Sequence, residues 1–386
     1  MHPTSAQLDQ VKSISPATLG ELQVWPPVVL APMAGITNAA FRKLCRRFGA
    51  GLYVSEMATA RGIVEDWPRS REISHFAPDE DPRSIQLYAT DPYWTGRAVE
   101  KLVSQSRVDH IDFNFGCPVR KITRKGGGAA LPLRRALFRE ILAEAVRHAG
   151  SVPITVKMRL GVDQNLQTFL EAGRIAEGEG VSAIALHART AAQLYSGKAD
   201  WARIGELKAA VTSVPVLGNG DIFEAGDALA MIRETGCDGV VIGRGCLGRP
   251  WLFRELADLF DGRSPLPAPT LGRVADVMVE HARLLVDLRG EDLAMPEFRK
   301  HASWYVLGYA VSPAERQRLC RVQSLHELED LASGLDPELE VDPNVLKAPR
   351  GKAGNPQKVA LPEGFLANRD DPMPIGAEPL AAFSGG

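Results

Sequence analysis

The chain has 386 residues, of which 45% are apolar and 24% are charged, and its formal net charge is −2. This is the composition of an ordinary globular protein. The near-neutral charge excludes a globally basic nucleic-acid binder, so any affinity for nucleic acid has to come from local patches. No stretch approaches 18 uncharged apolar residues, and the N-terminal MHPTSAQLDQ lacks the basic start and apolar core of a signal peptide. We therefore expect no membrane span, a cytoplasmic location and, as the simplest assembly, a monomer.

Short apolar runs alternate with helical stretches along most of the chain. The runs are rich in Val and Ile, which is typical of parallel strands covered on both faces, and they span 27–33, 52–57, 84–89, 110–115, 153–160, 183–188, 215–220 and 239–244. Between them, 134–149 carries apolar residues at helical spacing. Strands and helices in this order predict a (β/α)8 TIM barrel over 21–262. An open doubly wound sheet is the alternative, but it would normally carry GxGxxG after its first strand, where this chain has APMAG.

The remaining segments differ in composition from the barrel. Residues 261–270 (DGRSPLPAPT) predict a linker. Residues 271–335 predict a small all-helical domain, in which 273–289 has one apolar face that we expect to pack against neighbouring helices. Residues 1–20 and 336–386 are expected to be disordered, because the tail is rich in Pro and Gly and has few large apolar side chains.

In a (β/α)8 barrel the active site forms at the C-terminal ends of the strands. The residues at or just beyond these ends form a dense polar set: Pro32, Met33, Ala34, Glu56, Gln86, Asn114, Cys117, Lys157, Arg159, His187, Asn219, Gly220, Asp221, Gly243 and Arg244. The last two strands end in GNGD and GRG, and loops at these positions often hold a phosphate in this fold. A sugar phosphate and a flavin mononucleotide would both suit them, and glycines that only serve tight turns are the plainer interpretation.

Cys117 differs from the other cysteines, which are Cys45, Cys237, Cys246 and Cys320. Those four are expected to be small core residues. Because no CxxC pair is present, we expect no disulfide framework and no metal site. Cys117 lies at a strand end and precedes Pro118, which cannot donate to a ladder, so we expect its thiol in a loop at the barrel mouth, in a catalytic position.

Basic residues follow Cys117 and recur in the helical segment. Arg120, Lys121, Arg124 and Lys125 have no acidic residue near them in sequence, and a second cluster, PEFRKHASWY at 296–305, combines Arg299, Lys300 and His301 with Trp304 and Tyr305. Cations neutralise phosphates and aromatic rings stack on bases. Either cluster alone could be a solvated surface, but together they favour contact with a polyanion.

Together these motifs resemble the flavin-dependent tRNA-dihydrouridine synthases, and among them the bacterial B-type. The resemblance covers about 25–325 and rests on LAPMAGITNAAFR (30–42), Gln86 in SIQLYAT, NFGCPVRKITRKGGGAAL (114–131), VKMRLG (156–161), LHART (186–190), GNGDI (218–222), GRG (243–245) and FRKH (298–301). The chain departs from many relatives at Phe115 and at the glycine run 126–128, which is expected to loosen or reshape the loop of Cys117.

The resemblance implies an FMN-containing barrel and a helical domain that together clamp tRNA, with NADPH or NADH as the reductant. It implies that FMN is held by Pro32, Met33, Ala34, Gln86, Lys157, His187, Asn219, Gly220, Asp221, Gly243 and Arg244. Asn114 and Arg159 would lie near the uracil, and Arg299, Lys300 and His301 would face tRNA. In the implied reaction a hydride from flavin N5 reaches C6 of uracil, and Cys117 gives a proton to C5.

A thiol suits this role because it is protonated near pH 7 and can still donate. Lys157 would stabilise the negative charge that develops, or else form a structural salt bridge. Two other functions stay open at this point. One is a small-molecule flavin oxidoreductase of the dihydroorotate dehydrogenase kind, which would not need the helical domain. The other is a tRNA-binding protein that has lost catalysis, which would not need Cys117 or the glycine loops.

Overall fold

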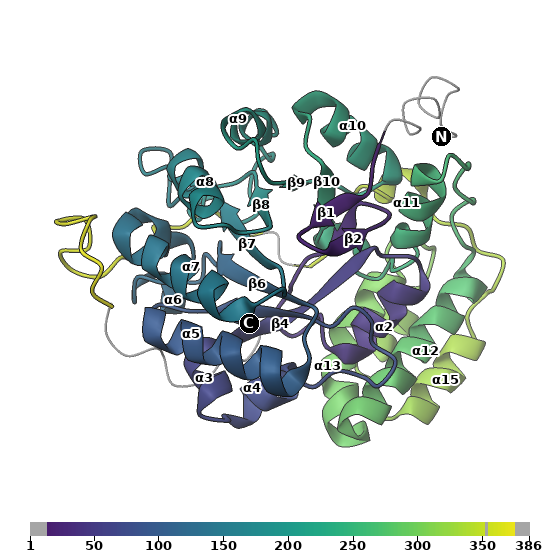
Figure 1. The fold of residues 1–386 in the computed structure, drawn as a ribbon. Coiled ribbons are helices and arrows are strands. Elements are labelled where there is room, and N and C mark those ends of the chain that lie inside the picture. The colour runs from purple at the N-terminus through teal and green to yellow at the C-terminus, as the bar shows by residue number, and fades with distance from the viewer. Residues whose placement is uncertain (1–13, 352–353, 375–386) are drawn as a thin grey trace.

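The computed structural model describes residues 14–351 and 354–374, and the first thirteen and last twelve residues lie outside this description. Its centre is a closed barrel of parallel strands in the order β3-β4-β5-β6-β7-β8-β9-β10, with β10 paired to β3 (Figure 1). The strands are β3 (Val28–Leu30), β4 (Leu52–Thr59), β5 (Ser84–Tyr88), β6 (His110–Phe115), β7 (Ile154–Arg159), β8 (Ala183–His187), β9 (Val216–Asn219) and β10 (Gly239–Ile242). The predicted (β/α)8 barrel is therefore confirmed, and the open sheet is excluded.

Helices surround the barrel: α2 (Ala39–Arg47), α3 (Ala60–Val64), α4 (Pro68–Ile73), α5 (Pro92–Lys101), α7 (Arg135–Ala149), α8 (Phe169–Gly178), α9 (Ala202–Ala210), α10 (Ala225–Thr235) and α11 (Leu252–Phe260). Local sequence sets their ends. Asn38 caps α2 by accepting a hydrogen bond from the Phe41 N–H at 3.1 Å, and Asp91 caps α5, in which Pro92 occupies the first turn where no donor is needed. Short segments complete the loops: η1 (Leu102–Ser106), α6 (Arg120–Thr123), η2 (Gly128–Leu133) and η3 (Arg244–Cys246).

A hairpin plugs the N-terminal end of the barrel. Its strands are β1 (Ala17–Leu19) and β2 (Leu22–Val24), which pair antiparallel. Leu19 and Val24 are buried with apolar side chains from the barrel interior. Residues 14–20 therefore differ from the expected disorder, because burying these side chains offsets the cost of ordering the segment. Residues 1–13 lie outside the described part.

The helical domain follows and packs beside α2, at the right of Figure 1. It contains α12 (Leu271–Arg289), α13 (Glu291–Tyr305), α14 (Pro313–Leu319) and α15 (Leu325–Ser333). Val274, Met278 and Leu285 of α12 are fully buried in its core, together with Phe298 of α13. The apolar face predicted for 273–289 thus packs against neighbouring helices. Among the described residues, no helix is both long and apolar enough to cross a membrane.

The tail also differs from the expected disorder. After η4 (Pro343–Val345), residues 354–374 lie against the barrel beside α7, as the yellow segment at the left of Figure 1. Phe365 is only 4% exposed and packs with Ala130, Leu133 and Val162. Burial of one such ring stabilises the segment by roughly 2–3 kcal/mol. Composition alone did not reveal this contact. The expectation for 375–386 falls outside the described residues.

Candidate active site

Strand register brings the predicted polar residues to one end of the barrel. Across adjacent strands, Gln86 is paired with Asp112 and Asn114 with Lys157. Farther round, Arg159 is paired with His187, which is paired with Asn219. Parallel neighbours lie about 4.8 Å apart, so side chains from five strands meet toward the C-terminal end of the barrel, as the sequence predicts.

A chain of hydrogen bonds runs from the barrel interior to the Cys117 loop. Gln86 Nε2 donates to Asp112 Oδ2 at 2.7 Å, and Asn114 Nδ2 donates to Gln86 Oε1 at 2.8 Å. The oxygen of Asn114 then accepts the backbone N–H groups of Gly116, at 3.1 Å, and Cys117, at 2.8 Å. Asn114 and Gln86 therefore support the loop, in addition to any contact with a ligand.

The Cys117 thiol is half-buried in this loop. Burial raises its pKa, while a backbone hydrogen bond from Val119 and the charge of Arg159 act in the opposite direction. The thiol form therefore predominates near pH 7, as an acid that donates a proton requires.

The glycine run behind Cys117 is packed tightly. A side-chain carbon at Gly128, where φ is +56°, would lie 2.5 Å from the Cys117 carbonyl oxygen, and one at Gly127 would lie 2.0 Å from the Tyr88 hydroxyl. All three glycines are buried. The run therefore reshapes the loop by close approach rather than loosening it.

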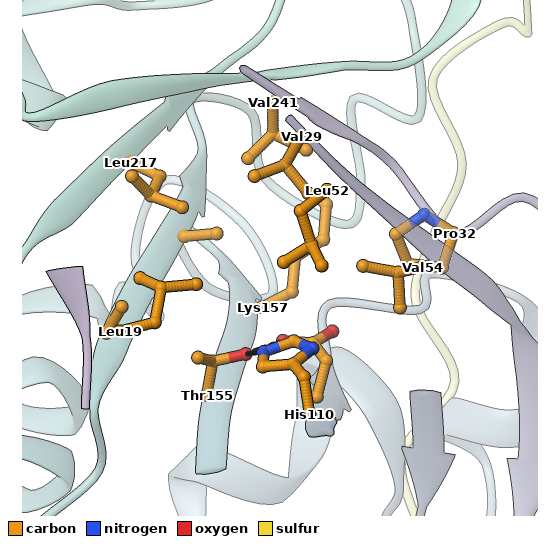
Figure 2. A pocket seen from close by; sticks show the side chains of 13 residues that line it. Leu19, Val29, Pro32, Leu52, Val54, His110, Thr155, Lys157, Leu217 and Val241 are labelled. Atoms are coloured by element: carbon orange, nitrogen blue, oxygen red, sulfur yellow. Dashed lines mark hydrogen bonds between the residues drawn. The ribbon is translucent and has the colours of Figure 1, made fainter. Parts of the chain in front are cut away.

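Lys157 projects into the barrel, whose interior around it is apolar except for His110, Asp112 and Thr155 (Figure 2). A cavity of about 20 Å³, enough for roughly one water molecule, is lined by Lys157, His110, Asp112 and Thr155 together with apolar side chains. Burial and the charge of Arg159 lower the pKa of Lys157 to about 8, although Asp112 opposes this effect. Burial raises the pKa of Asp112 to about 6. Both groups are thus mainly charged at pH 7, and Lys157 is close to titration.

Arginines gather around Tyr195 at the barrel mouth. The guanidinium carbon of Arg244 lies 4.3 Å from the centre of the Tyr195 ring, and that of Arg159 lies 5.5 Å from it. Arg159 also donates to the carbonyls of Thr190 and Leu194, at 3.0 and 2.8 Å. Burial and the surrounding cations lower the pKa of Arg159 to about 10 and hold that of His187 well below its usual value. His187 is therefore a neutral imidazole.

Asp221 balances only part of this positive charge. Its carboxylate accepts two bonds from Arg189 Nη2, at 2.8 and 2.7 Å, and one from the Ala199 N–H at 2.7 Å. Arg244 lies 3.9 Å from it. Arg189 is 1% exposed, and its Nη1 is buried without a hydrogen-bond partner among the described residues. A buried cluster with more cations than carboxylates fits an anionic ligand.

The end of the last strand, β10, leaves room for such a ligand. A side-chain carbon at Gly243 would meet only Ala31, at 3.9 Å, whereas one at Gly220 would collide with Ala199 at 2.7 Å. Asn219 donates from its Nδ2 to the Val241 carbonyl at 2.7 Å and so ties these two strands together. Gly243 and Arg244 thus present open backbone and a cation, while Asp221 orients arginines rather than lying free for a ligand.

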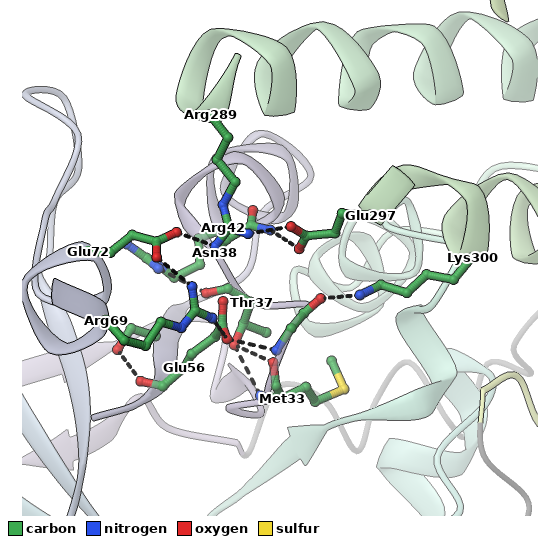
Figure 3. Close-up of polar contacts among 12 residues, drawn as sticks. Met33, Thr37, Asn38, Arg42, Glu56, Arg69, Glu72, Arg289, Glu297 and Lys300 are labelled. Atoms are coloured by element: carbon green, nitrogen blue, oxygen red, sulfur yellow. Dashed lines mark hydrogen bonds and ion pairs between the residues drawn. The ribbon is translucent and has the colours of Figure 1, made fainter. Parts of the chain in front are cut away.

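The loop after β3 is held from two sides, which Figure 3 shows. Met33 N donates to Thr37 Oγ1 at 3.0 Å, and Gly35 N donates to Glu56 Oε2 at 2.7 Å. Ala34 is exposed, and Pro32 lines the same cavity as Lys157.

The FRKH residues do not form one tRNA-facing cluster. Lys300 Nζ donates to the Gly35 carbonyl at 2.6 Å, and so joins the helical domain to the loop of Met33 (Figure 3). Arg299 Nε donates to the Val322 carbonyl at 2.9 Å and is half-buried. His301 is 0% exposed and packs 4.6 Å, centre to centre, from His281. The expectation that His301 faces tRNA is therefore wrong, because its ring is a core side chain.

The basic loop after Cys117 has the exposure expected of a docking surface. Arg120, Lys121 and Arg124 are exposed on and beside α6, and Lys125 is half-buried.

Three residues of the mouth were missed from sequence: Asp112, Arg189 and Tyr195. Asp112 could have been found from strand alternation, since it lies two residues before Asn114 and so shares its face. Arg189 follows His187 at the same interval. Tyr195 lies in a loop without a periodic pattern, so sequence spacing offered no signal for it.

Comparison with known proteins decides the family. The family described as "Dihydrouridine synthase (Dus)" matches residues 29–336. The chain belongs to this family. A relative from Mycobacterium tuberculosis (strain CDC 1551 / Oshkosh), named "Probable tRNA-dihydrouridine synthase", is 52% identical over 380 residues, covering 95% of this chain and 97% of that protein. The "tRNA-dihydrouridine synthase B" of Pseudomonas putida KT2440 is 37% identical over 316 residues, covering 82% of this chain and 92% of that protein. The predicted resemblance to the dihydrouridine synthases is thus confirmed.

Solved structures add only the fold. A histamine dehydrogenase from Rhizobium sp. 4-9 superposes with a TM-score of 0.52 and 15% sequence identity, over 76% of this chain and 51% of that chain. At this identity, the likeness to that protein concerns the fold alone.

Proposed function

We propose that this member of the dihydrouridine synthase family reduces the C5=C6 bond of specific uridines in tRNA to 5,6-dihydrouridine, with FMN as cofactor. The observation that carries the proposal is the pairing, in one barrel mouth, of a protonated thiol at Cys117 with a buried cationic cluster. The names of the relatives, which are tRNA-dihydrouridine synthases at 37 and 52% identity, support tRNA as the substrate.

The residues of the mouth fit the FMN proposal. The flavin, when bound, supplies the hydride that reaches C6 of the uracil. Arg244 and the backbone at Gly243 would hold its phosphate, with Gly220 and Asn219 shaping the neighbouring turn. Arg189, through its unpartnered Nη1, is added to this set on the basis of the structure. Pro32, Met33, Ala34, Gln86, Lys157 and His187 would line the ring system, and Asp221 would act by orienting Arg189.

Cys117 gives the proton that the reaction needs. When C6 gains a hydride, negative charge develops on C5 and on the C4 oxygen of the uracil. The Cys117 S–H bond breaks and a C5–H bond forms, which leaves a thiolate that solvent reprotonates. Lys157, charged, half-buried and paired in register with Asn114, would stabilise the developing charge. Arg159 and Asn114 would lie near the uracil, and the raised pKa of Cys117 keeps the proton available until it is needed.

The uridine has to leave its stack inside folded tRNA to reach this mouth, which costs a few kcal/mol. Phosphate contacts from Arg120, Lys121, Arg124 and Lys125 would offset this cost, with Arg299 at the edge of the helical domain. Lys300 acts in this proposal by joining the helical domain to the flavin loop through Gly35. Two electrons must enter for each uracil reduced, and we assign their delivery to NADPH or NADH. A tRNA substrate places the enzyme in the cytoplasm, and we propose that it works as a monomer.

The product formed on tRNA tests the proposal. The purified protein, with FMN and NADPH, is incubated with tRNA from cells that lack dihydrouridine, and the nucleosides are quantified by mass spectrometry. We expect dihydrouridine at defined positions, and none with Cys117→Ala in the same time. A flavin-containing protein that leaves tRNA unchanged but reduces free orotate-like pyrimidines would replace this function with the small-molecule alternative. A protein that binds tRNA but no flavin would replace it with the binding function.

A further inference from the structure

The chain beyond the family match forms a strap across the barrel rim. The family match ends at residue 336, yet residues 354–371, here called the C-terminal strap, lie along the loops that follow β6, β7 and β8. The mycobacterial relatives align with 95 and 91% of this chain, so they extend into regions that the family match leaves out. Nothing in the proposed chemistry uses this segment.

Gln357 of the strap bridges two loops of the active site. Its Nε2 donates to the Pro118 carbonyl at 2.8 Å and to the Ala191 carbonyl at 3.3 Å. Its backbone N–H donates to the Ala192 carbonyl at 2.8 Å. Pro118 is bonded directly to Cys117, and Ala191 and Ala192 begin the turn that leads to Tyr195. The Gln357 side chain thus connects the loop of Cys117 with the loop of Tyr195.

The strap touches the second loop again on the other side of Gln357. Gly354 adopts φ +64°, and a side-chain carbon there would lie 3.2 Å from Leu194 Cβ and 3.8 Å from the Tyr195 nitrogen. The backbone therefore passes directly against the turn that carries Tyr195, at a position that favours glycine for both conformation and space.

The far end of the strap is anchored to the barrel wall. Phe365 is buried with Ala130 and Leu133, and the Arg134 guanidinium lies 5.9 Å from the centre of its ring. Asp371 pairs with Arg134 at 2.7 Å, and Asp370 pairs with Arg135, with one contact at 2.7 Å. Arg369 donates to the Leu133 carbonyl at 2.9 Å and pairs with Glu171. An anchored segment can hold a loop in place, whereas a frayed tail cannot.

We propose that Gln357 is a positioning residue, through which the C-terminal strap fixes the loop of Cys117 relative to the loop of Tyr195. This inference rests on the proposed function only for its catalytic consequence. A small displacement of the Cys117 thiol would slow the protonation of C5, because proton transfer requires donor and acceptor to be aligned.

The experiment compares Gln357→Met, which keeps the side-chain length but removes both donors, with Asn355→Ala, which changes an exposed neighbour. Holoenzyme is treated with iodoacetamide, and the alkylation of each cysteine is followed by mass spectrometry. Cys320 in the helical domain is half-buried and serves as an internal reference thiol, and Cys45, Cys237 and Cys246 are buried and report unfolding. We expect Gln357→Met to raise the Cys117 rate about fivefold relative to Cys320, with Asn355→Ala unchanged.

Turnover is measured on the same samples. We expect kcat on tRNA to fall about tenfold in Gln357→Met, with KM for tRNA and flavin content unchanged. If Gln357→Met leaves both Cys117 alkylation and kcat unchanged, the inference is overturned. It is also overturned if alkylation of the buried cysteines rises, because that result shows that the whole protein has loosened. Failure of the wild-type protein to modify tRNA would refute the proposed function, while the alkylation ratio would still decide whether Gln357 fixes the Cys117 loop.

Discussion

The barrel mouth and the core of the helical domain both bury ionisable side chains, but in opposite ways. In the mouth, Lys157, Arg159 and Arg189 are cations. Asp112 is the carboxylate that acts on Lys157, and Asp221 pairs with Arg189. In the helical domain, His281 and His301 are fully buried beside Phe41 and Phe298. Burial lowers the pKa of His281 to about 3 and, with the nearby cations, keeps that of His301 far below its usual value.

The two regions show how a buried polar atom without a partner should be interpreted. Arg189 Nη1 and both ring nitrogens of His301 lack partners within the described chain. An arginine stays charged, so the orphaned nitrogen of Arg189, in a mouth with more cations than carboxylates, supports the proposed anion site. An imidazole can become neutral, so its orphaned nitrogens cost stability without indicating a ligand. The same observation, an unpartnered buried nitrogen, thus supports a proposed ligand site in the mouth and reflects packing in the helical domain.

The largest effect on activity should come from removing the Cys117 thiol, the proposed acid of the barrel mouth. Cys117→Ala is expected to slow reduction of tRNA uridine by about 10²- to 10⁴-fold, because the proton for C5 loses its donor. Flavin binding should not change. Single-turnover kinetics with the reduced enzyme measure this, and Cys320→Ala is the matched control. A Cys117→Ala enzyme with wild-type rates would show that another group protonates C5.

Charge in the mouth is tested next. Arg244→Met is expected to weaken FMN binding by about 10- to 100-fold, since a charge-assisted hydrogen bond contributes roughly 1.5–3 kcal/mol. Titration of the apoprotein with FMN, followed by flavin fluorescence, gives the Kd. Arg254→Met on the outer face of α11 removes an equal charge from an exposed site and should leave the Kd unchanged. Equal losses in the two variants would contradict a specific site in the mouth.

The histidine core should respond to pH rather than to ligand. Unfolded histidine binds a proton below about pH 6.5, whereas buried His301 does not. The unfolded state therefore binds more protons, and stability falls as pH drops below 6.5. From pH 7.5 to 5.5 this costs about 1.4 kcal/mol for one such histidine. His301→Leu should reduce the loss of unfolding free energy over this range by that amount, as urea titrations would measure. An unchanged pH dependence would mean that His301 titrates normally in the folded protein.

The smallest effect is expected on the exposed basic loop. Lys121→Gln with Arg124→Gln should weaken tRNA binding about fivefold, and the slope of log K against log salt should fall by about 0.7–0.9 for each phosphate that the loop no longer neutralises. Filter binding at several salt concentrations measures both. Arg139→Gln with Arg147→Gln, at two exposed positions of α7, provides a control with the same loss of two charges and no expected change in slope. A slope unaffected in the loop variant would remove α6 from the tRNA surface.

The sequence is sufficient to predict the barrel, because its strands are short, β-branched and apolar on both faces. It also predicts the mouth, since residues at parallel strand ends meet at one edge of the sheet. His301 could have been assigned correctly as well. Phe298, His301, Ala302 and Tyr305 recur at helical spacing and are all buried, so the histidine shares a face with core residues rather than with Arg299 and Lys300.

The remaining features depend on contacts between distant parts of the chain. Tyr195 meets Arg159 and Arg244 only because its loop converges with the end of β7 and the start of η3, and no local pattern encodes this. The strap is held by Phe365 and a few ion pairs, and a single aromatic residue in a stretch rich in Pro and Gly carries too little signal to predict order. Composition alone underestimates the order of such a segment, because the residues that hold it lie on the surface of the barrel.

The most direct measurement of the central claim joins flavin and tRNA in one turnover. The enzyme is reduced anaerobically with NADPH, excess reductant is removed, and the flavin absorbance is followed after mixing with tRNA that lacks dihydrouridine. The account predicts flavin reoxidation together with one dihydrouridine formed per flavin, and reoxidation at least about a hundredfold slower in Cys117→Ala. A reduced flavin that persists in the presence of this tRNA, and is reoxidised by a free pyrimidine instead, would contradict it.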